Sequence, residues 1–190
     1  MASGLHTGFE LDRRWHWLRG EMEETKKPAL LQLARILEEN GVPYAVIGGI
    51  AMQVHQEEPR TTLDIDVAVE DRSAIPEAAL VAAGFKRTGR FSHSENWEGP
   101  GATPVPFTDD PELRSSISRA ITVPLDLVEL RVLSIGDLLH AKLRAAVDPA
   151  RRRSKRLQDL ADAQALIEKE PKLAASLTPS ERELLARAGA

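Results

Sequence analysis

The pattern of apolar residues changes from helical to extended after residue 40. Over residues 28–39 apolar side chains recur every three or four positions, and Asn40-Gly41 follows, which predicts an amphipathic helix with a C-terminal stop. Residues 44–47 form a short apolar run typical of a buried strand. The run ends at Gly48-Gly49 and leads into residues 50–52, so this part predicts a strand, a tight turn and a short helix.

Apolar residues alternate with other residues over positions 63–69, which predicts a second strand. Leu63 and Ile65 belong to its apolar face, whereas Asp64 and Asp66 share the opposite face. Two acids on one face of a strand are unusual. This strand is therefore the first candidate for a functional site.

The rest of the chain predicts strands first and helices afterwards. We expect the following elements: a helix over 73–83, strands joined by a mobile loop over 85–108, a short helix over 111–120, an extended segment over 121–133, and helices over 134–147, over 151–168 and after Thr178. The predicted fold is α+β, with a small mixed β-sheet core flanked by helices (28–133). An N-terminal arm or helix (1–27) precedes it, and a helical C-terminal part (134–190) packs on the core.

Composition narrows the classes of protein that this chain can represent. It has 190 residues, of which 42% are hydrophobic, and no cysteine, which excludes disulfides, thiolate zinc sites and thiol nucleophiles. A formal net charge of −4 argues against a strongly basic nucleic-acid coat protein. No apolar run approaches the roughly 18 residues of a membrane span, and the first twenty residues carry charges. We expect a soluble, cytoplasmic protein with no membrane partner.

Asp64 and Asp66 suit a divalent cation. Residues at i and i+2 of a strand project from one face about 6.5–7 Å apart, so their carboxylates can converge on an ion. Oxygen ligands favour Mg²⁺ or Mn²⁺, and Mg²⁺ takes the rest of its shell from water and substrate phosphates. The Gly48-Gly49 turn allows close backbone approach, and the amides that open the following helix can face a phosphate. Each part alone also has an ordinary explanation, as turn chemistry or as a solvated strand face.

Taken together, these segments resemble a known signature. Gly48-Gly49-Ile50-Ala51 followed by Arg60-x-Thr62-x-Asp64-Ile65-Asp66 resembles the nucleotidyltransferase signature of the DNA polymerase β superfamily, in the form carried by AbiEii-type and MenT-type toxins. Lys142-Leu143-x-Ala145, followed by Lys155-Arg156-x-x-Asp159-x-x-Asp162, resembles the downstream motifs of the same proteins. The resemblance covers about residues 28–170.

The resemblance implies roles for single residues. Asp64 and Asp66 would hold the metal, and Lys142 would meet the phosphates, with Asp159 as a helper carboxylate. The nucleotide-binding set would comprise Gly48, Gly49, Arg60, Thr62 and Lys142. Many superfamily members carry a third acid on a neighbouring strand. Here Asp126 has the local pattern, although it can equally lie at the turn of a hairpin, and the segment 105–108 offers Pro106 instead.

Two features of the C-terminal part remain open at the level of sequence. A hairpin that folds back at Asp148-Pro149 places Lys142 opposite Asp159, and a lysine on the apolar arc of its helix needs a counter-charge. The alternative is a lysine that extends along the surface to reach water. The basic run Arg151, Arg152, Arg153, Lys155 and Arg156 is either a solvated helix start or a contact for the RNA backbone.

The predicted function is Mg²⁺-dependent (or Mn²⁺-dependent) transfer of a nucleoside monophosphate from a nucleoside triphosphate. The acceptor would be an RNA, such as a tRNA, or a protein hydroxyl, and the protein would act as a toxin with a possible cognate antitoxin. The alternative is a catalytically degenerate protein of the same fold that binds a nucleotide or a partner. The Asp64/Asp66 pair and Lys142 favour the enzyme, and the uncertain third acid favours the alternative.

Overall fold

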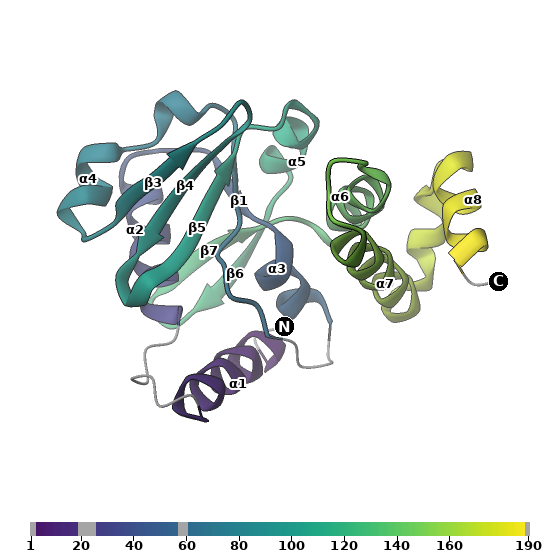
Figure 1. Ribbon diagram of the computed structural model, residues 1–190, viewed down its shortest axis with the longest axis horizontal. Coiled ribbons are helices and arrows are strands. Elements are labelled where there is room, and N and C mark those ends of the chain that lie inside the picture. The colour runs from purple at the N-terminus through teal and green to yellow at the C-terminus, as the bar shows by residue number, and fades with distance from the viewer. Residues whose placement is uncertain (1–2, 19–25, 57–60, 189–190) are drawn as a thin grey trace. The chain divides into compact units, whose positions relative to one another are not determined.

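The computed structural model describes residues 3–18, 26–56 and 61–188. The chain divides into two compact units, Met1–Leu133 and Ser134–Ala190. The first unit contains the sheet, and the second contains helices (Figure 1). The fold is α+β, as predicted. In the described part of the chain, none of the helices is long and apolar enough to cross a bilayer.

The described residues of the first unit form a seven-stranded mixed sheet with the order β3-β4-β5-β2-β1-β7-β6. The strands are β1 (Tyr44–Val46), β2 (Val67–Val69), β3 (Lys86–Arg90), β4 (Ser94–Gly99), β5 (Thr103–Thr108), β6 (Ile121–Leu125) and β7 (Val128–Val132). β2 runs antiparallel to β1 and parallel to β5, so it lies in the middle of the sheet. A strand in this position is paired on both edges, and all three residues of β2 are buried.

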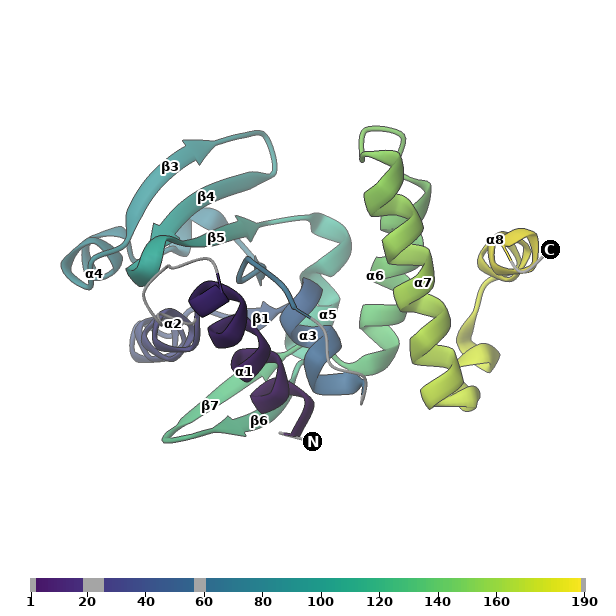
Figure 2. The same ribbon diagram turned by 60° about the horizontal axis from the view of Figure 1, so that its bottom comes forward.

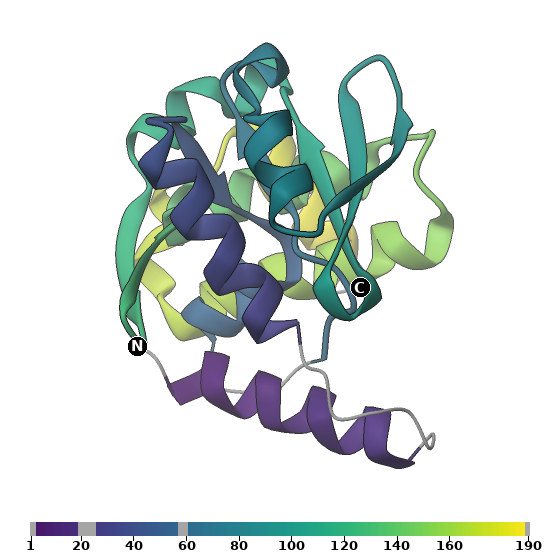
Figure 3. The ribbon, with the colours of Figure 1, turned by 90° about the vertical axis from the view of Figure 1, so that its left-hand side faces the viewer.

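Helices of the first unit pack on this sheet and at its ends. They are α1 (Ser3–Leu18), α2 (Lys27–Glu39), α3 (Gly48–His55), α4 (Glu77–Ala82) and α5 (Arg114–Ser118), with short 3₁₀ turns at Arg72–Ala74, Pro100–Ala102 and Pro111–Leu113. The amphipathic α2 contacts β7, and Figure 3 shows it in front of the strands. Leu33 and Leu37 of α2 are buried in the same core as Trp97 and Phe107.

The N-terminal residues form a regular helix rather than a loose arm. α1 lies beside α3 (Figure 2). Leu5, Phe9 and Asp12, spaced by four and three positions, are buried on one face of α1. A Cβ atom at Gly8 would overlap the side chain of Gln53 on α3, so the two helices approach closely because this position carries no side chain.

Two elements are shorter than the alternation and the helical spacing predict. The predicted strand over 63–69 is paired as β2 only from Val67, and Leu63 is exposed. The predicted helix over 73–83 is split, because Pro76 forces Ile75 into an extended conformation (ψ 123°), and α4 begins only at Glu77.

The second unit consists of α6 (Ile135–Val147), α7 (Arg153–Lys169), a 3₁₀ turn (Pro171–Ser176) and α8 (Pro179–Ala188). The predicted start of α6 is confirmed, since the Ser134 hydroxyl accepts a hydrogen bond from the Asp137 amide at 3.2 Å. Thr178 and Glu181 form the reciprocal cap of α8, with bonds of 2.8 and 3.3 Å. α6 and α7 pack side by side (Figures 1 and 2).

Candidate active site

The Gly48-Gly49 turn lies directly on the segment that carries the two aspartates. Gly48 has φ +61°, and a Cβ atom built on it would overlap the carboxylate of Asp66. A Cβ atom at Gly49 would overlap the side chain of Thr62. Both glycines are therefore required for close approach, and Gly48 also for its left-handed backbone. The two halves of the sequence signature meet at this contact.

Backbone hydrogen bonds hold the aspartate segment on both sides. The Ile47 amide donates to the Asp66 carbonyl at 2.9 Å, and the Ile65 amide donates to the Pro104 carbonyl at 2.9 Å. Asp64 and Asp66 are half-buried, and Ile65 between them is fully buried. The segment is thus anchored by backbone hydrogen bonds before the paired strand β2 begins at Val67.

The N-terminus of α3 faces the aspartate segment. Its N-cap residue is Ile47, which has no side-chain oxygen and makes no capping hydrogen bond. The amides of the first helical turn have no partner within the helix itself. Gly48 and Gly49 lie at this end, against Asp66 and Thr62. The arrangement joins a helix N-terminus, which favours negative charge, to the segment that carries Asp64 and Asp66, whose oxygens are ligands that Mg²⁺ prefers.

Gly48→Ala should destabilise the protein more than Gly41→Ala. Gly41 has φ +63°, almost the same as Gly48, but a Cβ atom there would meet nothing within 4 Å. Gly41→Ala therefore costs only the left-handed backbone, about 1–2 kcal/mol. Gly48→Ala must also displace Asp66, which adds about 1–3 kcal/mol of overpacking. Urea unfolding measures both free energies, and equal losses in the two variants would contradict the close contact between Gly48 and Asp66.

Thr62 connects the aspartate segment to a buried lysine. The Thr62 hydroxyl donates to Asp64 Oδ1 at 2.8 Å, and Lys26 Nζ donates to the Thr62 carbonyl at 2.6 Å. Lys26 also forms an ion pair with Asp12 of α1. Burial lowers the pKa of Lys26 to about 8, and the negative charge of Asp64 partly opposes this shift. The sequence signature does not include Asp12 or Lys26.

The second unit contains a cluster of buried charges between α6 and α7. Lys142 Nζ lies 3.0 Å from Asp159 Oδ1 and 2.7 Å from Asp162 Oδ2. The predicted pairing of Lys142 with Asp159 across the hairpin is confirmed, and the surface-lysine alternative is wrong, since only 9% of the Lys142 side chain is exposed. Arg151 Nε is 2.5 Å from Asp159 Oδ2. Arg151 therefore belongs partly to this ionic cluster rather than only to the exposed basic run.

The other predicted site residues have different positions. Asp126 lies at the β6–β7 turn with φ +52° and forms an ion pair with Lys27 at 2.9 Å. Over the residues that the structure describes, no three His, Asp or Glu side chains are grouped to hold a metal, so Asp126 does not join Asp64 and Asp66. Arg60 lies outside the described residues. Arg152, Arg153 and Lys155 are exposed, and Arg156 is half-buried.

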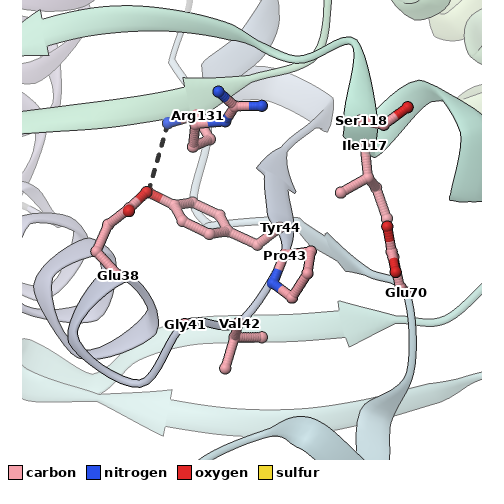
Figure 4. Close-up of a pocket in the computed structure, with 9 residues that line it drawn as sticks. All are labelled: Glu38, Gly41, Val42, Pro43, Tyr44, Glu70, Ile117, Ser118 and Arg131. Atoms are coloured by element: carbon pink, nitrogen blue, oxygen red, sulfur yellow. Dashed lines mark hydrogen bonds between the residues drawn. The ribbon is translucent and has the colours of Figure 1, made fainter.

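A pocket of about 400 Å³ opens elsewhere in the first unit, between the end of α2 and β1 (Figure 4). Tyr44, Glu38, Glu70 and Arg131 line it, and the Arg131 amide donates to the Tyr44 hydroxyl at 3.4 Å. Burial raises the pKa of Tyr44 to about 12, so this phenol is neutral at physiological pH. None of the predicted site residues lines this pocket.

Comparisons with known proteins support the fold. The sequence matches no protein-family model and no characterised protein at a significant level. Solved structures do resemble it. ANT(2")-Ia in complex with adenylyl-2"-tobramycin is 15% identical with a TM-score of 0.56, and the match covers 87% of this chain and 99% of that one. The solution structure of ANT(2'')-Ia gives a TM-score of 0.55 at 16% identity, over 86% and 90% of the two chains.

A second protein gives the same result. An antigenic nucleotidyltransferase-like protein from Paracoccidioides brasiliensis is 19% identical with a TM-score of 0.50, over 78% of this chain and 90% of that one. At these identities the likeness concerns the path of the backbone. The chain therefore has the nucleotidyltransferase fold.

Proposed function

We propose that this protein transfers a nucleoside monophosphate from a nucleoside triphosphate to an acceptor hydroxyl. The observation that carries the proposal is the contact of the Gly48-Gly49 turn with Asp66 and with Thr62, whose hydroxyl bonds Asp64; this contact supports a phosphate-binding role for the turn. In the reaction, the acceptor oxygen bonds to the α-phosphorus, and the bond from that phosphorus to the bridging oxygen breaks. Pyrophosphate leaves, and the hydroxyl proton passes to solvent or to a carboxylate.

Asp64 and Asp66 fit Mg²⁺ or Mn²⁺. Such an ion is commonly held by one or two carboxylates together with substrate phosphates, so two acids are a sufficient protein contribution. When bound, it would neutralise charge on the phosphates during transfer. Asp64 is oriented by the Thr62 hydroxyl, and Asp66 is held against Gly48. The protein would contribute to catalysis mainly by positioning the triphosphate and by holding these carboxylates in one orientation.

The remaining roles follow the family resemblance. Lys142 would supply positive charge to the phosphates, with Asp159 holding its ammonium group in place. Arg60 would contact a phosphate or brace the aspartate segment. The acceptor would be an RNA, such as a tRNA, or a protein hydroxyl, and the biological setting would be a cytoplasmic toxin of AbiEii or MenT type with a cognate antitoxin. The described side chains group no third acid with Asp64 and Asp66, and the alternative function is a nucleotide-binding protein without transferase activity.

An acceptor screen tests this function. The protein is incubated with Mg²⁺ and each α-³²P-labelled nucleoside triphosphate, together with total RNA, with total protein, or with an aminoglycoside. The aminoglycoside is included because one structural neighbour is a complex with adenylyl-2"-tobramycin. We expect label on one macromolecular fraction and with one preferred nucleotide. Binding of nucleotide without label on any acceptor would favour the degenerate protein.

Arg152→Gln/Arg153→Gln should weaken RNA binding if RNA is the acceptor. Both side chains are exposed, whereas Arg151 is bonded to Asp159 and is left unchanged. The RNA association constant K falls as salt rises, and loss of two phosphate contacts should make the slope of log K against log salt less steep by about 1.4 for single-stranded RNA. The control Lys172→Gln/Arg182→Gln makes the same change in net charge at exposed positions outside the run. Equal slopes for both double variants would make the run a solvated helix start.

A further inference from the structure

A buried ion pair joins α1 to the segment that carries Asp64. Asp12 is 5% exposed and Lys26, just before α2, is 6% exposed. The Lys26 ammonium group bonds to the Asp12 carboxylate and to the Thr62 carbonyl, and it lies 5.9 Å from the centre of the Phe9 ring. Asp12, Phe9 and the Thr62 carbonyl thus surround the buried ammonium group of Lys26.

Both ends of Thr62 are fixed by this arrangement. Its carbonyl receives the Lys26 hydrogen bond, and its hydroxyl donates to Asp64 Oδ1 at 2.8 Å. Gly49 packs against its side chain. Lys26 therefore holds the backbone of the residue whose hydroxyl bonds the Asp64 carboxylate.

Helix docking alone does not account for the buried charges. An ion pair taken out of water gains little over a well-packed apolar pair of similar volume, because both ions lose their hydration. Leu5 and Phe9 are already buried on α1, and the close approach at Gly8 attaches α1 to α3. The hydrogen bond to Thr62 is the contact that an apolar pair would lose.

We propose that Lys26, held by Asp12, is a positioning residue that orients Asp64 through Thr62, which makes α1 part of the candidate active site. The proposal rests on the proposed function, because it takes Asp64 as a ligand of the divalent cation. Partners that orient a metal ligand from behind typically contribute 10–100-fold to metal affinity.

Metal binding by the full chain tests this role with Mn²⁺ alone as the probe. The double variant Asp12→Leu/Lys26→Met removes both charges together, so no unpaired ion remains buried. If Lys26 positions Asp64, the Kd for Mn²⁺, measured from the free-ion signal in electron paramagnetic resonance, should rise at least about tenfold. Simple electrostatics predicts little change, because the double variant removes one positive and one negative charge together and leaves the net charge near the site unaltered. A Kd equal to or below that of the wild type would therefore overturn the proposal.

Thr62→Val keeps the proposal testable if the double variant does not fold. Valine preserves the shape that packs against Gly49 and leaves the Asp12–Lys26 ion pair in place, but it removes the hydrogen bond to Asp64. We expect a similar rise in the Kd for Mn²⁺. The triple variant should show no further rise, since both changes break one chain of contacts. Fully additive losses, or a Thr62→Val Kd equal to that of the wild type, would refute the positioning role.

Asp64→Asn distinguishes a failure of the metal site from a failure of the positioning role. If the wild type binds Mn²⁺ and Asp64→Asn does not, the metal site stands, and the Lys26 and Thr62 variants decide the positioning role alone. If Asp64→Asn binds Mn²⁺ as the wild type does, or if the wild type binds none, the metal site of the proposed function is wrong, and the positioning role falls with it.

Discussion

Asp64→Asn should reduce nucleotidyl transfer by about 10³-fold or more. The substitution removes one of two carboxylates proposed to hold the metal, and charge neutralisation by a bound metal contributes several kcal/mol to such reactions, at about 1.4 kcal/mol for each factor of ten. The fold should survive, because the amide Oδ1 of asparagine can still accept the 2.8 Å hydrogen bond from Thr62. Single-turnover transfer of α-labelled nucleotide measures the loss.

Asp126→Asn is the matched control for Asp64→Asn. It makes the same chemical change at the acid that the sequence also offers as a metal ligand but that lies in the β6–β7 turn. Asparagine tolerates the left-handed backbone there (φ +52°), so only an exposed ion pair with Lys27 is lost. Activity near that of the wild type is expected. Equal activity of the two variants would contradict the assignment of the site to Asp64.

Lys142→Met should cost about 3–5 kcal/mol of stability, because it leaves two buried carboxylates without their shared counter-charge. Asp159 and Asp162 are 2% and 4% exposed, and both lie within 3.0 Å of the Lys142 ammonium group. Arg151 would still neutralise Asp159, but it does so at the edge of the cluster, where 41% of its side chain is exposed. Urea unfolding followed by circular dichroism measures the loss.

Two further variants control the Lys142 measurement. Lys155→Met removes the same charge from an exposed position on α7 and should change stability by less than about 0.5 kcal/mol. Adding Asp162→Asn to Lys142→Met should restore part of the loss, since the remaining Asp159 keeps its bond to Arg151. Unfolding of Lys142→Met at the urea concentration of the wild type would show that the buried cluster contributes nothing.

The sequence predicts best what is close along the chain. The contact of Gly48 with Asp66 joins the turn after one strand to the start of the neighbouring strand, with a single short helix between them. The spacing of the two motifs along the sequence is therefore enough to predict it. The pairing of Lys142 with Asp159 likewise follows from one hairpin and one break at Asp148-Pro149. In both cases a few local rules of geometry limit the possible arrangements.

Other features depend on contacts between distant segments, and the pattern of apolar and polar residues could not predict them. The alternation at 63–69 does not reveal where β2 begins, because pairing with β1 and β5 sets that boundary. A lone Asp12 on the apolar face of α1 was a signal for a buried counter-charge, but nothing nearby in the sequence identifies Lys26 as its partner. The run of basic residues likewise does not predict the hydrogen bond of Arg151 to Asp159, because this bond forms only when α6 and α7 pack together.

The bond that breaks in the nucleotide identifies the type of group transfer. Parallel reactions with α-³²P-labelled and γ-³²P-labelled nucleoside triphosphate, Mg²⁺ and the acceptor found by screening distinguish nucleotidyl from phosphoryl transfer. For nucleotidyl transfer at the Asp64/Asp66 site, we expect the α-label on the acceptor and the γ-label in pyrophosphate, in equal amounts, and neither product with Asp64→Asn. Transfer of the γ-label to the acceptor, or label transfer that Asp64→Asn retains in full, would contradict it.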